Sequence, residues 1–191
     1  MEEQKQPLSA QQSLDIITAM ISQAKGNVSA NSFHFLLWGW TIVIANVGVY
    51  IMLRFTNIHN ATSIFMITIL SAIASFVYGM RQSRNATSKT ILDVANMWIW
   101  ICYGVICFTF VAFGYKTNWQ INPILITVGS IPTFVTGIML RFKPLMFGGA
   151  ALWVCGIILF LLPVDLQFLF SAIAVTLGYL VPGYMLRKSN N

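Results

Sequence analysis

The chain has 191 residues, of which 57% are hydrophobic and only 8% are charged, whereas about 25% of the residues in a soluble domain are charged. So few charges cannot cover a water-exposed surface, which excludes a typical cytosolic enzyme, a disordered chain and a secreted disulfide scaffold. The mean hydropathy of +0.74 predicts instead a membrane protein. The formal net charge of +6 arises from 11 lysines and arginines against 5 acidic residues.

The N-terminal segment predicts an amphipathic helix ahead of the apolar region. It has no apolar core of a signal peptide, so we expect no cleaved leader. Residues 9–12 form a Ser-x-x-Gln capping box, and apolar residues recur at helical spacing over 14–21. We expect this helix to cover about 9–25 and to end at Gly26 and Asn27. It either lies on the membrane or under the bundle, or it docks a cytoplasmic or membrane protein partner.

Six apolar runs are long enough to cross a bilayer, which requires about 20 residues in a helix. None carries a charge in its middle, and continuous apolar runs of this length must be helices. The sequence therefore predicts an all-α membrane protein with a cytoplasmic segment over 1–31, a six-helix transmembrane domain over 32–187 and a cytoplasmic tail over 188–191. The predicted spans are 33–53, 63–80, 94–114, 124–140, 145–162 and 166–186.

The basic residues indicate how the spans are oriented. Nine of the 11 lysines and arginines belong to the termini and to the second and fourth connections, while Arg54 and Lys116 fall on the other side. The positive-inside rule then places both termini in the cytoplasm. Because the basic residues occur singly or in pairs at span ends, we expect no nucleic-acid partner; a homo-oligomer stays open.

A threefold repeat is suggested by recurring residues. The odd-numbered spans carry tryptophan within 37–40, 97–100 and 152–155, and the even-numbered spans end with Met and Arg close together. This pattern predicts three helical hairpins of the same orientation. The alternative is that tryptophan and arginine merely mark the membrane interfaces.

Polar and helix-breaking residues within the spans are candidate functional positions. Neutral polar side chains hydrogen-bond neighbouring helices or the preceding turn, or they line a path for a solute. Proline removes a backbone hydrogen bond, so we expect interruptions in the fourth and sixth spans, where a transporter places a hinge or a site. The candidates are Asn46, Ser130, Pro132, Thr133, Thr136 and Pro182.

Three further candidates lie at the inner membrane face. His34 and Trp38 are four residues apart, so the two rings share one side of a helix, as interfacial anchors or as a site. Asp93 opens the third span, where a helix N-terminus favours a carboxylate.

No catalytic or metal-binding motif is recognisable. The sequence lacks HExxH, GxSxG and a phosphate-binding loop, and its three cysteines (Cys102, Cys107 and Cys155) lie in apolar runs without the spacing of a zinc site. We therefore expect no enzyme activity, no catalytic residue, no metal and no cofactor.

Three stretches resemble a group of uncharacterised multi-pass inner-membrane proteins from Bacteroidota-type bacteria. They are residues 31–40 (NSFHFLLWGW), 142–145 (FKPL) and 180–184 (LVPGY). The resemblance implies an inner-membrane location and implies no reaction.

Taken together, these features predict a non-enzymatic sensing or accessory membrane protein whose N-terminal helix contacts a partner. The alternative is a carrier or channel for a small neutral or apolar solute, with a path lined by Asn46, Ser130, Pro132, Thr133 and Thr136.

Overall fold

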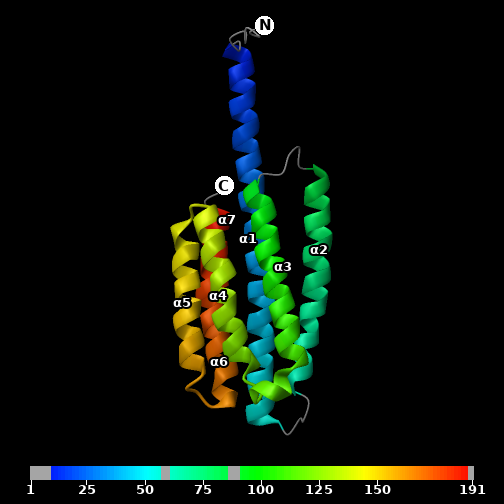
Figure 1. The fold of residues 1–191 in the computed structure, drawn as a ribbon, viewed down its shortest axis with the longest axis vertical. Coiled ribbons are helices and arrows are strands. Elements are labelled where there is room, and N and C mark those ends of the chain that lie inside the picture. Colours follow the sequence, from blue (N-terminus) through cyan, green and yellow to red (C-terminus); the bar gives the residue numbers. More distant parts are fainter. Residues whose placement is uncertain (1–9, 57–60, 86–90, 189–191) are drawn as a thin grey trace.

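The structure is a computed structural model in which the backbone is described for residues 10–56, 61–85 and 91–188, and side chains for 32–56, 61–82 and 91–188. These residues are almost entirely helical, and no strand occurs among them. The helices run side by side along one axis (Figure 1). This confirms the all-helical class.

Helix α1 (Ala10–Phe55) is one continuous helix of 46 residues. The expected end at Gly26 and Asn27 is therefore wrong. Each of these residues disfavours a helix by only about 1 kcal/mol or less, and proline is absent from the segment, so the two predicted helices join. The N-terminal half of α1 extends beyond the other helices (Figure 1). The predicted capping box includes Ser9, which lies outside the described residues.

Within the described residues, five helical segments are long and apolar enough to cross a membrane, so the structure supports a membrane protein. These are Ser32–Phe55 of α1, Ala61–Gln82, Ile91–Ala112, Ile121–Met139 and Val164–Lys188. Helix α5 (Lys143–Leu159) is also apolar but has only 17 residues, at the lower end of the range for spans. The predicted count of six spans is therefore reached only if α5 crosses the membrane as well.

The region from the second to the fourth segment contains two 3₁₀ helices as well as three α-helices. The second consists of η1 (Ala61–Met66) followed by α2 (Ile67–Asn85). Helix α3 (Ile91–Ala112) is followed by η2 (Gly114–Thr117) and then by α4 (Ile121–Met139). The N-terminal end of α1 and the C-terminal end of the chain lie at the same end of the bundle (Figure 1).

The last segment contains a π-helical turn instead of a break. It comprises α6 (Val164–Val175), the π turn η3 (Thr176–Leu180) and α7 (Val181–Lys188). In the π turn the N–H of Val181 donates to the carbonyl of Thr176, directly before Pro182, which has no N–H to donate. The expected interruption at Pro182 is thus wrong, because widening one turn keeps the helix continuous.

Helix α4 likewise continues through Pro132. The expected break there is wrong, since membrane helices tolerate proline where neighbouring groups satisfy the freed backbone.

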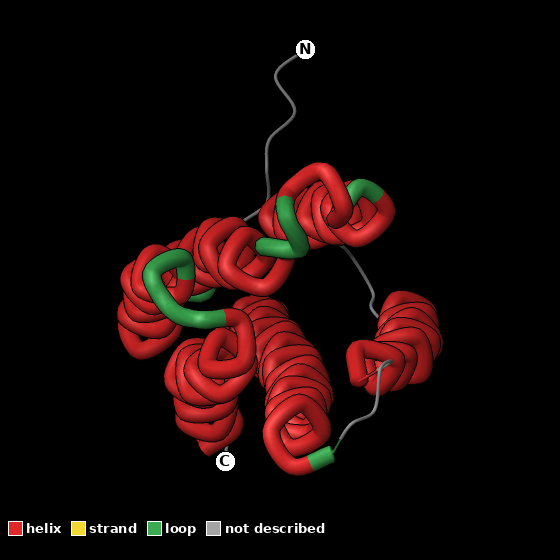
Figure 2. The backbone as a smooth tube through the Cα atoms, turned by 90° about the horizontal axis from the view of Figure 1, so that it is seen from below, coloured by secondary structure: helices red, strands yellow, loops and turns green. Residues whose placement is uncertain are grey.

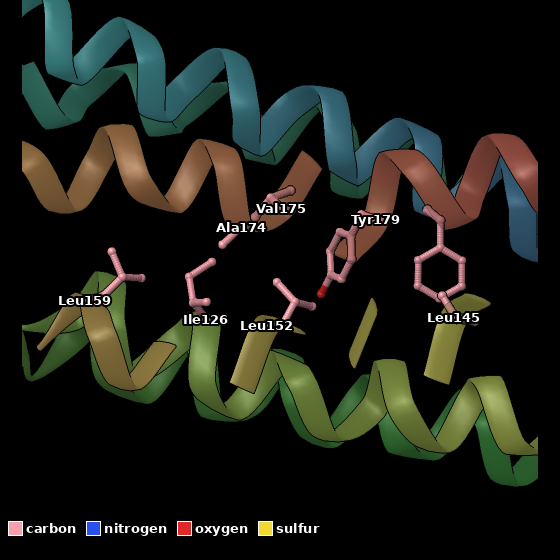
Figure 3. Close-up of a cluster of buried hydrophobic side chains, with 8 residues drawn as sticks. Ile126, Leu145, Leu152, Leu159, Ala174, Val175 and Tyr179 are labelled. Carbon is pink, nitrogen blue, oxygen red and sulfur yellow. The ribbon is translucent and has the colours of Figure 1, made fainter. Parts of the chain in front are cut away.

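The packed core lies between α1, α4, α5 and the α6–α7 segment. Its buried side chains include Leu145, Leu152 and Leu159 from α5, which face Val175 and Tyr179 across the core (Figure 3). The most extensively packed helix pair is α4 with α5, followed by α1 with α6. Glycines allow this approach: a Cβ placed on Gly149 would lie 2.7 Å from the backbone nitrogen of Phe134.

Helices α2 and α3 are packed much more loosely. No residue of α3 is buried among its described residues, and α2 packs on α1 and η1 with few if any contacts to α3. Seen along the bundle, α2 stands apart from the remaining helices (Figure 2). The three predicted hairpins therefore pack unlike one another, and their descent from a threefold repeat stays a prediction.

Candidate functional site

The contact between α1 and α2 is made by hydroxyls and rings. The indole Nε1–H of Trp38 donates to Ser75 Oγ at 2.9 Å, and His34 Nδ1 lies 3.1 Å from the same oxygen. One turn deeper, the hydroxyls of Thr41 and Ser71 are 2.6 Å apart. We call these five residues the α1–α2 polar cluster. The prediction that His34 and Trp38 share one side of a helix is confirmed.

Stacked rings extend this cluster toward the end of the bundle that holds the C-terminus. Phe33 stacks on Tyr78 with ring centroids 4.0 Å apart, and His34 forms a T-shaped pair with the same tyrosine, with ring centroids 5.6 Å apart. Near this end of the bundle, α2 is therefore attached to α1 through aromatic contacts and hydrogen bonds.

A second polar cluster joins α3 to α4. Trp100 Nε1–H donates to Thr136 Oγ1 at 3.2 Å, and the Thr136 hydroxyl donates to Asn96 Oδ1 at 2.7 Å. Thr136 is fully buried, so the two bonds satisfy a hydroxyl that would otherwise be costly within the membrane. The Trp100 ring also meets the edges of Phe35 and Tyr179, which connects α3 to the packed core.

The other α4 hydroxyls bond within their own helix. Thr133 Oγ1 donates to the carbonyl of Gly129 at 2.7 Å, and Ser130 Oγ donates to that of Thr127 at 2.6 Å. Pro132 is buried beside them. These are local bonds of the type expected for serine and threonine in membrane helices.

Amide side chains form a third cluster, which joins α1, α4 and α6. Asn122 Nδ2 donates to Asn46 Oδ1 at 3.1 Å, and Gln167 Nε2 donates to Gln120 Oε1 at 2.9 Å. Asn46 is completely buried and also donates to the carbonyl of Ile42. The hydroxyl of Ser171, one turn after Gln167, is buried without a hydrogen-bond partner among the described residues.

Asp93 lies in the first turn of α3 and is partly buried. Its position at a helix N-terminus agrees with the sequence, since a carboxylate is stabilised by the helix dipole there. The predicted neighbour Lys89 lies outside the described residues.

The structure thus places the predicted candidates in separate interfaces. Asn46, Thr133 and Thr136 have no exposed surface, so no water-sized space touches them in this conformation. Pro182 is buried after the π turn. Within the described part of the chain, no three His, Cys, Asp or Glu side chains come together in a group that could hold a metal ion.

Sequence reasoning missed several residues that contact these positions. Gln167 is 1% exposed and Tyr179 is 7% exposed, although both types usually reach a surface. Gln167 is the one amide side chain in α6, which is a signal that the sequence contains. The ring contacts of Tyr179 depend on three helices meeting and leave no local signal.

Comparison with known proteins identifies no relative of this chain. No protein-family model, no curated protein and no solved structure matches the chain.

Proposed function

We propose that the protein is a non-enzymatic sensing or accessory protein of the inner membrane, with six spans and both termini in the cytoplasm. The N-terminal half of α1 would contact a cytoplasmic or membrane protein partner. The observation that carries this proposal is the continuous length of α1.

The length of α1 exceeds what a bilayer requires. At about 1.5 Å per residue, its 46 residues span about 69 Å, whereas the bilayer with its headgroups is about 40–45 Å thick. At least 20 Å of helix must therefore extend beyond an upright span. A rigid helix that joins the bundle to the aqueous phase can report changes in the bundle to a partner.

The basic residues support the orientation. Three arginines lie near the C-terminal ends of α2, α4 and α7, at the end of the bundle that holds the C-terminus: Arg81, Arg141 and Arg187. Arg54 and Lys116 lie at the other end. Helix α5 would supply the sixth span, since an even number of spans returns the chain to its starting side.

The carrier alternative has less support. The polar residues that would line a path are packed against protein in this conformation, as Asn46, Thr133 and Thr136 demonstrate. A flux of small neutral solutes into liposomes containing the protein would favour that alternative over the present proposal.

Two experiments test the proposal. For the orientation, we expect green fluorescent protein to fluoresce on either terminus and alkaline phosphatase to be inactive on both. For the partner, we expect deletion of residues 1–26 to abolish its recovery after crosslinking in cells. Asn27→Pro, which breaks the continuous helix, should reduce recovery several-fold, while Asn27→Ala should not. Unchanged recovery after the deletion, at equal membrane abundance, would contradict the proposal.

A further inference from the structure

A shallow groove runs along the outer surface of α2, and α1 contributes Phe33 to its lining. Its apolar part is lined by Leu70, Ile73 and Val77, with the small side chain of Ala74 between them. All four side chains are exposed, so in a membrane they face the hydrocarbon. We call this feature the α1–α2 groove.

One end of the groove is polar. The stacked rings of Phe33 and Tyr78 close it, and Arg81 lies one turn beyond Tyr78. Among the described residues, no carboxylate lies within 4.0 Å of the Arg81 guanidinium. The groove therefore has an apolar length, an aromatic step and a positive charge in that order, which is the order of chemical groups in an anionic phospholipid.

The length of the groove also fits one lipid chain. Leu70 and Arg81 are 11 residues apart, which corresponds to about 16 Å along a helix. Half of the hydrocarbon core measures about 15 Å. A chain lying from Arg81 to Leu70 would thus reach the middle of the bilayer.

We propose that the α1–α2 groove binds one anionic phospholipid of the leaflet on the side of the termini. Its acyl chain would lie along Leu70, Ile73 and Val77, and its phosphate would pair with Arg81. An apolar transmembrane helix would cover the apolar residues but would bring no negative charge to the guanidinium, whereas a phosphate satisfies it with charge-assisted hydrogen bonds. This inference rests on the proposed function only for the membrane location and the orientation.

Native mass spectrometry of the purified protein tests the proposal. Phosphatidylglycerol and phosphatidylcholine with identical acyl chains would be titrated separately. We expect the first phosphatidylglycerol to bind about fivefold more tightly, since one basic residue near the membrane surface contributes about 1 kcal/mol to anionic lipid binding. Equal affinities for the two lipids would overturn the proposed role of Arg81.

Two pairs of variants separate the groove from general lipid adhesion. Arg81→Gln should remove the preference for phosphatidylglycerol, while Arg187→Gln, which changes an exposed arginine at the end of α7, should retain it. Ala74→Phe should weaken the binding of both lipids by filling the groove. Ala72→Phe, at an exposed position outside the groove, should leave the binding unchanged.

Two results would overturn the proposal. The first is an equal loss in Arg81→Gln and Arg187→Gln, because the binding would then reflect overall charge. The second is unchanged binding of both lipids in Ala74→Phe, because the acyl chain would then lie elsewhere. Neither result affects partner recovery through residues 1–26, so failure of this inference is distinguishable from failure of the proposed function.

Discussion

The helices of the α4–α5 pair and those of the α2–α3 pair are all apolar, but the two pairs differ in how closely their helices approach each other. In the first pair, Gly137 and Gly149 leave no room for a Cβ, which would lie 2.7 Å from a backbone nitrogen of the facing helix. In the second pair, Gly79 and Gly104 have nothing within 4 Å of the corresponding position. Without a hydrophobic force between helices in lipid, close backbone approach decides which helices associate.

The looser pair depends more on polar contacts. Helix α2 is attached through Ser71 and Ser75, and α3 through Trp100 and its bond to Thr136. Hydrogen bonds between membrane helices contribute on average about 0.6 kcal/mol, so we expect α2 to separate from the bundle more readily than α5 does. Easier separation of α2 would suit a sensing function, because α1 contacts both α2 and the packed core.

Gly149→Ala should have the largest effect. The added Cβ would lie within 3 Å of three Phe134 atoms, two of them in the backbone, so α4 and α5 must move apart. Overpacking of this kind costs about 1–3 kcal/mol, and thermal unfolding in detergent would measure it as a lower melting temperature. An unchanged melting temperature would mean that the two regions do not differ in packing as described.

Ser75→Ala should have a smaller and more local effect. It removes the oxygen that Trp38 and His34 contact, with an expected cost of about 1 kcal/mol. Hydrogen exchange followed by mass spectrometry should be faster in α2 and unchanged in α5. Ser130→Ala is the matched control, because the Ser130 hydroxyl bonds only a carbonyl of its own helix in the structure. Equally faster exchange in both helices would argue against independent attachment of α2.

Gly104→Ala should act in the opposite direction to Gly149→Ala. The site is open, and alanine favours a helix over glycine by about 0.5–1 kcal/mol. A slightly higher melting temperature is therefore expected in the same thermal assay. A decrease comparable to that of Gly149→Ala would reveal a partner packed against α3 in the purified protein.

Arg54→Gln should have the smallest effect. The Arg54 guanidinium lies 4.0 Å from the carboxylate of Asp165, with side chains 63% and 36% exposed. Exposed pairs of this kind contribute about 0–1 kcal/mol, so the melting temperature should fall by no more than about 4 °C. A larger decrease would assign the ion pair a real role in holding α1 to α6.

Much of the helical layout could be predicted from local sequence. The predicted boundaries agree with the observed helices within a few residues at most ends, because charged and turn residues close each apolar run. The shared side of His34 and Trp38 follows directly from helical spacing. The two expected proline breaks and the expected end at Gly26 and Asn27 were wrong, because local preferences of about 1–3 kcal/mol are offset by backbone adjustment and by the flanking helical turns.

The sequence by itself determined that this is an all-helical, apolar chain with its basic residues gathered at one end of the spans, because hydropathy and charge act locally. Only the tertiary structure decided which polar residue meets which partner. The pairs Trp38–Ser75, Asn46–Asn122 and Trp100–Thr136 are 37, 76 and 36 residues apart, so their contacts depend on how the helices pack against one another. The same packing leaves α2 against α1 and η1, with the groove that ends at Arg81 on its outer surface.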